Sequence, residues 1–154
     1  MLFEQLCDIF LEQNRYGPVY HGGKWDGKSP IKIGRGALGT GAYFSPIRSV
    51  AERYARENNG IVVEAYLKVS NPLIIKMSRE KPTHAGVLAL ELLGMDRNKA
   101  INMVERVEEQ KGYLGKEISS RAIPQGYDCI FQYFDDQLRE IVVWSSDKVI
   151  NNSI

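Results

Sequence analysis

Apolar and polar positions along the chain follow two periods, which predict short strands toward both ends and helices between them. Residues 61–69 carry apolar side chains at the odd positions, with Glu64 and Lys68 on the other side, so a strand is expected there. Residues 2–13 carry apolar side chains at i, i+4, i+7 and i+8, which predicts an amphipathic helix. The further expected strands are 19–21, 43–44, 73–75, 127–134 and 140–144.

Start and stop signals indicate the remaining helices. Ser45 and Pro46 predict the first residues of a helix that ends at Asn58-Asn59-Gly60, because serine can cap free amides and proline suits the first helical position. The other helical segments are 83–111, with a break near Gly94 and a cap at Asp96, and 116–122. Strands and helices do not alternate regularly, so the pattern predicts an α+β fold rather than a doubly wound α/β fold.

The segment 24–41 is rich in glycine, lysine and serine, and we expect it to be mostly loop. Within it, residues 34–39 read G-R-G-A-L-G and match the glycine pattern of dinucleotide-binding folds. In such folds a helix follows this turn, and here that helix would contain Gly41 and Pro46. Proline inside a helix costs about 3 kcal/mol, so we reject this interpretation. A glycine-rich loop lying close to a ligand is the better prediction.

Length, charge and cysteine content narrow the class of protein. The 154 residues, 44% hydrophobic and 25% charged, predict one globular domain spanning 1–154. A net charge of +1 argues against a protein that binds nucleic acid mainly by neutralising phosphates. Cys7 and Cys129 form neither a disulfide framework nor a zinc cluster, and no metal site is expected. The acidic start and the lack of a long apolar run predict a cytoplasmic protein without membrane contact.

Three short motifs occur in a fixed order along the chain: residues 20–22 read Y-H-G, residues 41–46 read G-A-Y-F-S-P, and residues 139–144 read R-E-I-V-V-W. Together they resemble the H-Y-E branch of the ADP-ribosyltransferase superfamily, the branch of diphtheria toxin and the poly(ADP-ribose) polymerases. The resemblance spans about 18–58 and 126–150 and implies a split antiparallel β-sheet core with flanking helices. Residues 77–120 match no pattern that we can name.

The resemblance implies that the protein uses NAD+ as co-substrate and breaks the nicotinamide–ribose bond. Glu140 would bind a hydroxyl of the nicotinamide-side ribose and face the positive charge that grows on the sugar. His21 would bind the adenosine-side ribose, and the backbone of Gly22 would reach the nicotinamide carboxamide. Tyr43 and Tyr54 would hold the nicotinamide ring between them. Each assignment has a purely structural alternative. Glu140 would then be a solvent-facing strand carboxylate, His21 a core histidine, Gly22 an ordinary turn glycine, and Tyr43 and Tyr54 core residues.

Cationic side chains in the glycine-rich segment are candidates for the pyrophosphate. Arg35 is preferred over Lys32 and Lys24 because its fork of donors suits a phosphate, although solvated lysines on a loop need no such role.

The sequence departs from relatives at several positions. Gly23 stands where many of them have serine or threonine, and Ala51 stands where polymerase members have a serine that contacts the carboxamide. One or two hydrogen bonds to NAD+, each about 1 kcal/mol net, would then be missing. Leu138 replaces the residue typical of arginine-modifying relatives, so arginine is not supported as the acceptor. We expect an acidic, short acceptor loop at 135–139.

The preferred function is transfer of one ADP-ribose unit from NAD+ to a macromolecule. A protein is the expected acceptor, and a nucleic acid is possible but not favoured. The absence of accessory domains resembles stand-alone bacterial or phage modifiers of host machinery, a group that includes anti-CRISPR proteins. Two alternatives stay open: an NAD+ glycohydrolase, in which water attacks the sugar, and an inactive binding module of the same fold. RNA phosphotransfer by a related fold is disfavoured by Tyr43 and Glu140.

Overall fold

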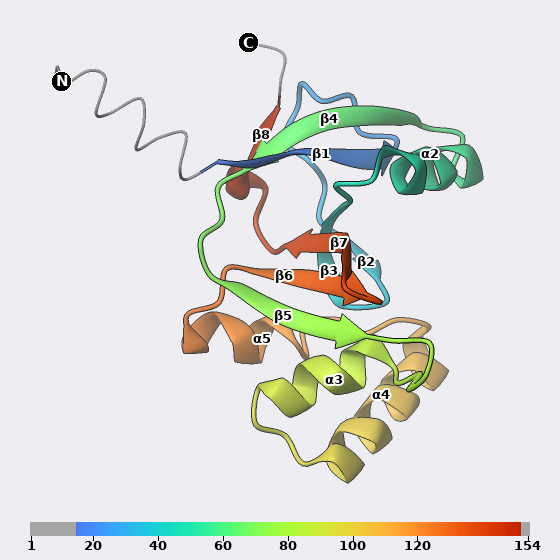
Figure 1. The fold of residues 1–154 in the computed structure, drawn as a ribbon, viewed down its shortest axis with the longest axis vertical. Coiled ribbons are helices and arrows are strands. Elements are labelled where there is room, and N and C mark those ends of the chain that lie inside the picture. The colour runs from blue at the N-terminus through green and yellow to red at the C-terminus, as the bar shows by residue number, and fades with distance from the viewer. Residues whose placement is uncertain (1–14, 152–154) are drawn as a thin grey trace, which may run out of the picture.

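The computed structural model describes residues 15–151. Within them the elements form three layers: a small sheet with one helix beside it, a larger sheet, and a group of helices below the larger sheet (Figure 1). This arrangement confirms the α+β prediction. The helix expected at 2–13, together with Cys7, lies outside the described residues. No helix of the described chain has the length and apolar character needed to cross a membrane.

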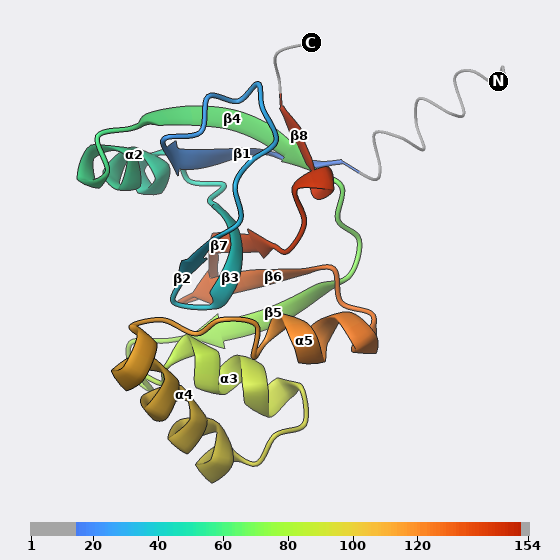
Figure 2. The ribbon, with the colours of Figure 1, turned by 180° about the vertical axis from the view of Figure 1, so that it is seen from behind.

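The small sheet has the strand order β1-β4-β8 and is antiparallel throughout. Its strands are β1 (Tyr16–Gly23), β4 (Ile61–Leu67) and β8 (Val149–Asn151). Helix α2 (Arg48–Glu57) lies beside β1 and β4 (Figures 1 and 2). The predicted strands at 19–21 and 61–69 are therefore correct, with β1 longer than expected.

The large sheet has the strand order β2-β3-β7-β6-β5. Its strands are β2 (Gly34–Gly36), β3 (Gly39–Phe44), β7 (Gln137–Val143), β6 (Cys129–Phe134) and β5 (Pro72–Met77). Strands β5 and β6 run parallel, whereas we expected an antiparallel core. The chain between them crosses over through the helical layer, which is the kind of connection that parallel neighbouring strands require.

The helical layer covers one face of the large sheet. It contains α3 (Ala85–Leu92), α4 (Arg97–Lys111), α5 (Ser119–Ala122) and the short 3₁₀ helix η1 (Ile123–Gln125); a second 3₁₀ helix, η2 (Ser146–Lys148), precedes β8. The expected break and cap are confirmed, since Gly94 has a φ of 102° and the Asp96 carboxylate accepts from the amides of Asn98 and Lys99.

One prediction at the start of the chain is confirmed and one is wrong. The segment 24–41 is mostly loop, as expected, although β2 and the first half of β3 pair as a hairpin across Gly36 and Gly39. The hairpin also confirms that the G-x-G-x-x-G stretch does not join a strand to a helix. The helix expected at Ser45 begins at Arg48 instead. Ser45 is held extended because its backbone exchanges two hydrogen bonds with Tyr20, at 2.8 and 2.9 Å.

Two apolar clusters hold the layers together. One lies between the large sheet and the helices and contains Leu73, Ile75, Ile130 and Val142. The other lies between the two sheets and contains Phe44, Leu67, Phe131, Ile141 and Val143. Cys129, buried and unpaired, belongs to the second cluster, where burial raises the pKa of its thiol. The alternation along β7 therefore divides its side chains between the two cores.

Candidate active site

A cleft of about 530 Å³ opens where the two sheets meet through the Tyr20–Ser45 bridge. Strands β1 and β3, the β2–β3 hairpin, helix α2, strand β7 and the segment after α4 all contribute to its walls. The structure thus brings the early, middle and late motifs of the sequence to one cavity. The residues that the argument uses are His21, Gly22, Arg35, Tyr43, Ala51, Tyr54, Tyr113 and Glu140.

His21 is fixed by a backbone hydrogen bond and by aromatic neighbours. Its Nδ1 lies 2.7 Å from the carbonyl oxygen of Tyr43, and since a carbonyl only accepts, Nδ1 carries the hydrogen. The ring contacts Phe44 and Trp25 at centroid distances of 5.5 and 5.9 Å. Burial lowers the pKa of His21, with the hydrogen bond to Tyr43 acting in the opposite direction. His21 is therefore neutral near pH 7, with Nε2 as a hydrogen-bond acceptor.

Tyr43 is fixed in a similar way by the β2–β3 hairpin. Its hydroxyl donates to the carbonyl of Gly39 at 2.6 Å and accepts from the amide of Leu38 at 3.0 Å. A Cβ added at Gly36 would lie 2.7 Å from the ring, so glycine there lets the ring lie flat on the hairpin. Burial first, and the nearby Glu140 among other groups, raise the pKa of Tyr43. The phenol is neutral and its ring position is set by backbone groups.

Helix α2 supplies the wall opposite the hairpin. Gly22 packs directly on it, since an added Cβ would lie 1.8 Å from the carbonyl oxygen of Ala51. The glycine is therefore required by helix packing, whatever else its backbone contacts. Ala51 is buried, whereas Tyr54 has 37% of its surface exposed and lies at the cleft. Its place on the apolar face of the helix had left open that Tyr54 is a core residue. The exposure of its side chain at the cleft rejects that alternative.

Glu140 lies in the middle of β7 and not at the start of a strand, as we had expected. The register shifts next to it: Leu138 pairs with Tyr133 and Glu140 pairs with Gln132, so Arg139 is the extra residue of a β-bulge. Bulges re-aim side chains at many sites. Ile141 is fully buried on the opposite face, as expected.

The carboxylate of Glu140 has an unusual environment. No hydrogen bond to it is formed by any residue in 15–151, while burial raises its pKa from 4.5 to about 7. Arg139 and Arg53 partly oppose the effect of burial. A carboxylate that is partly desolvated and accepts no hydrogen bond interacts strongly with a positive charge that develops nearby.

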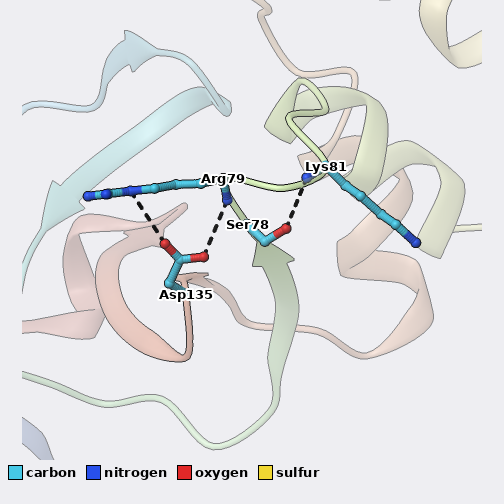
Figure 3. A network of polar contacts seen from close by, with 4 residues as sticks. All are labelled: Ser78, Arg79, Lys81 and Asp135. Atoms are coloured by element: carbon cyan, nitrogen blue, oxygen red, sulfur yellow. Dashed lines mark hydrogen bonds and ion pairs between the residues drawn. The ribbon is translucent and has the colours of Figure 1, made fainter.

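The turn before β7 is shorter than predicted. We expected a loop at 135–139, but β7 begins at Gln137, so only Asp135 and Asp136 form the connection. Both have positive φ, 47° and 68°, which suits a two-residue hairpin turn. Arg79 holds the turn from the side: its amide donates to Asp135 Oδ1 at 3.3 Å and its Nε lies 3.6 Å from Oδ2 (Figure 3).

The cationic candidates separate into two groups. Arg35 and Lys32 line the cleft from the hairpin side, whereas Lys24 is not among its lining residues. Arg35 is exposed and its guanidinium lies near Gly115, so it is free of the core and close to the cavity.

Tyr113 also lines the cleft, and sequence reasoning missed it. It belongs to the region 77–120 that matched no pattern. The available signal was an aromatic residue between Gly112 and Gly115, directly after a helix, but such a signal cannot tell which cavity the residue faces.

Comparison with known proteins identifies the family of the chain. A family model described as "ADP-Ribosyltransferase in polyvalent proteins" matches residues 13–152. One solved structure, described as "Crystal structure of an anti-CRISPR protein", is similar with a TM-score of 0.39 and 15% identity, covering 87% of this chain and 92% of that chain. No curated protein matches the sequence.

Proposed function

The chain belongs to the family of ADP-ribosyltransferases found in polyvalent proteins, and on that premise we propose that it transfers a single ADP-ribose unit from NAD+ to a protein. The observation that supports this best is the convergence of His21, Tyr43 and Glu140 on one cleft. Family membership implies NAD+ as the co-substrate. The H-Y-E assignment of these three residues is our proposal.

The properties of Glu140 suit the difficult step of the reaction. Breaking the nicotinamide–ribose bond leaves an oxocarbenium-like sugar, and nicotinamide departs with the bonding electron pair. A carboxylate without hydrogen-bond partners in a desolvated site stabilises this positive charge more in the transition state than in the ground state. The acceptor then forms the new bond with its lone pair and loses a proton to solvent.

The other cleft residues suit binding. His21 Nε2 can accept a hydrogen bond from a ribose hydroxyl, because Nδ1 is committed to the carbonyl of Tyr43. Tyr43 and Tyr54 offer aromatic rings at the same cavity, which fits a flat nicotinamide between them. Arg35 also lines the cleft, and in our proposal its guanidinium fork binds the pyrophosphate. Gly22 and Ala51 line the same cleft.

Gly23 bears on the strength of binding. A Cβ there would lie 3.1 Å from His21 Nε2, so the serine or threonine of many relatives would cover this nitrogen. In this chain Nε2 stays open to a ribose hydroxyl, but the hydroxyl that residue 23 supplies in many relatives is missing, so we propose weaker NAD+ binding rather than a different reaction.

The direct test is incubation of the full chain with NAD+ carrying a label on its adenosine, with and without bacterial lysate, followed by mass spectrometry. Label on a protein together with released nicotinamide is the expected result. Free ADP-ribose as the only product, with lysate present, would instead indicate a glycohydrolase.

An inactive binding module is the remaining alternative. It predicts NAD+ binding by calorimetry with no nicotinamide release. The partly buried Glu140, whose pKa burial raises, argues against it, because a module that only binds gains nothing from a carboxylate kept in such an environment. The placement among phage or bacterial modifiers of host machinery stays a prediction from the resemblance.

A further inference from the structure

An apolar side chain is open to solvent on the face of the large sheet that is opposite to the helical layer. Leu73 and Ile75 of β5 pack into the core on the helical side, so Ile74 between them points to the other face. There 45% of the surface of Ile74 stays exposed. In the described chain β5 is the last strand of the sheet order, so Ile74 lies at the edge of the sheet.

Further apolar side chains continue this surface from Ile74 across β6 and β7. Phe131 pairs with Ile74, and Tyr133 pairs with Leu138, in the register of the sheet. The ring of Tyr16, at the start of β1, lies 5.0 Å from the ring of Phe131. Tyr16, Tyr133 and Leu138 are only half-buried. These five residues form one continuous apolar surface, which we call the sheet patch.

The sheet patch lies where the described chain begins. Tyr16 belongs to the patch and is the first residue of β1, so the residues before it join the molecule at this place. The family model starts at residue 13, so residues 1–12 precede the part of the chain that it matches. Three extended residues span about 10 Å, which is also the usual separation of two packed sheets. Residues 13–15 are therefore long enough to lead from β1 onto the large sheet.

The composition of residues 2–13 is complementary to the sheet patch. Four apolar residues recur at helical spacing: Leu2, Leu6, Ile9 and Phe10. The charged residues of this segment are all acidic and are also four apart: Glu4, Asp8 and Glu12. On a helix these two sets lie on different sides. The patch supplies the apolar partner, and Lys76, exposed on the same face of β5 as Ile74, supplies a cation beside it.

We propose that residues 2–13 dock on the sheet patch of their own chain as an amphipathic helix, with the apolar stripe against Ile74 and Tyr133. An isolated helix of this length is marginal in water, so burial of the stripe is what stabilises it. The docked helix also covers Leu138, the residue before the bulge at Arg139, and so supports the strand that carries Glu140. The inference does not depend on the proposed function.

The experiment follows amide hydrogen exchange in residues 2–13 of the full chain, by mass spectrometry of the peptide that contains them. A synthetic peptide of residues 1–14 gives the rate without docking. The variants are Ile74→Asp, which places a charge on the patch, and Leu6→Asp, which places one on the stripe. Leu92→Asp is the control, since Leu92 is 54% exposed but lies on α3 in the helical layer. The thermal midpoint and the molar mass by light scattering are measured for each variant.

In the wild type, exchange in residues 2–13 should be at least about tenfold slower than in the free peptide. Ile74→Asp and Leu6→Asp should each bring the rate to within about threefold of the peptide, whereas Leu92→Asp should keep the wild-type rate. If Ile74→Asp lowers the thermal midpoint strongly, Leu6→Asp decides, because it lies outside residues 15–151.

Three results overturn the inference. One is wild-type exchange as fast as in the free peptide. Another is slow exchange that persists in a folded Ile74→Asp variant, which places the segment elsewhere. The third is slow exchange that disappears on dilution together with a dimeric mass, which makes a second copy of the chain the partner of the segment. None of these readouts involves NAD+, so the proposed function and this inference can fail separately.

Discussion

The two sides of the cleft are stabilised in opposite ways. On the side of His21 and Tyr43, the imidazole Nδ1 and the phenol hydroxyl are hydrogen-bonded to backbone groups. On the side of Glu140, the carboxylate has no hydrogen-bond partner within residues 15–151, and burial raises its pKa to about 7. The first side fixes geometry and adds to stability, whereas the second reduces stability.

This difference suggests a division of roles. Rings that bind a flat ligand have to be preorganised, and hydrogen bonds to the backbone achieve this without lowering stability. A group that stabilises a transient positive charge works best when nothing else neutralises it. Substitutions on the two sides should therefore have opposite effects on stability and unequal effects on activity.

The largest effect is expected from Glu140→Gln. The substitution keeps the shape of the side chain but removes the charge that faces the sugar, so nicotinamide release should fall about 100- to 1,000-fold. Glu105→Gln, an exposed change on α4, is the control and should retain full activity. A Glu140→Gln enzyme within a few-fold of the wild type would remove the distinction between the two sides.

The pH dependence of activity should follow Glu140. Its carboxylate form is required, and with a pKa of about 7 the value of kcat/KM for NAD+ should rise about tenfold from pH 6 to pH 8. Burial lowers the pKa of His21 below its ordinary value, so its titration falls on the acid side of that of Glu140. A profile that is flat from pH 6 to pH 8 would contradict the assignment.

The same Glu140→Gln variant should be more stable than the wild type at alkaline pH. Because the pKa of Glu140 is higher in the folded chain than in the unfolded chain, its contribution to stability is lost as the pH rises through about 7. The variant should therefore gain up to about 3 kcal/mol in the free energy of unfolding near pH 8. Urea unfolding at pH 8 and pH 4 tests this, since the gain should nearly vanish at the lower pH.

Tyr43→Phe should show the opposite behaviour. It leaves the amide of Leu38 and the carbonyl of Gly39 without their partner, so the free energy of unfolding should fall by about 1–3 kcal/mol. The ring remains in place, and the Kd for NAD+ should rise by less than about threefold. Denaturant unfolding measures the free energy of unfolding, and calorimetric titration measures the Kd for NAD+. A stability as high as that of the wild type would show that the hydroxyl contacts are not structural.

The smallest effect is expected from Arg139→Gln. Arg139 is one of two arginines that lower the pKa of Glu140 against the effect of burial. Without it, the midpoint of the activity profile should move about half a unit to higher pH, while the maximal rate stays near that of the wild type. A midpoint that moves to lower pH would show that Arg139 acts in another way.

Much of the fold was predictable because it depends on local patterns. The alternation in 61–69 predicted β4, and Asp96 predicted the start of α4 because its side chain caps nearby amides whatever the surroundings. Ser45 has the same chemistry but does not cap α2. Its backbone pairs with Tyr20, 25 residues earlier, and that pairing overrides the local preference. The parallel β5–β6 pair was missed for the same reason, since strand direction depends on the path of the whole chain.

The sequence by itself determined which residue types were available to a site: an imidazole before glycine, tyrosines near an early helix and a glutamate in a late strand. Only the tertiary structure decided that these residues share one cavity, that Arg139 bulges out before Glu140, and that Tyr113 joins them from a segment without a recognisable motif. The physical reason is that burial and proximity come from packing between distant segments. The high pKa of Glu140 and the exposure of Tyr113 are properties of those neighbours and not of the residues themselves.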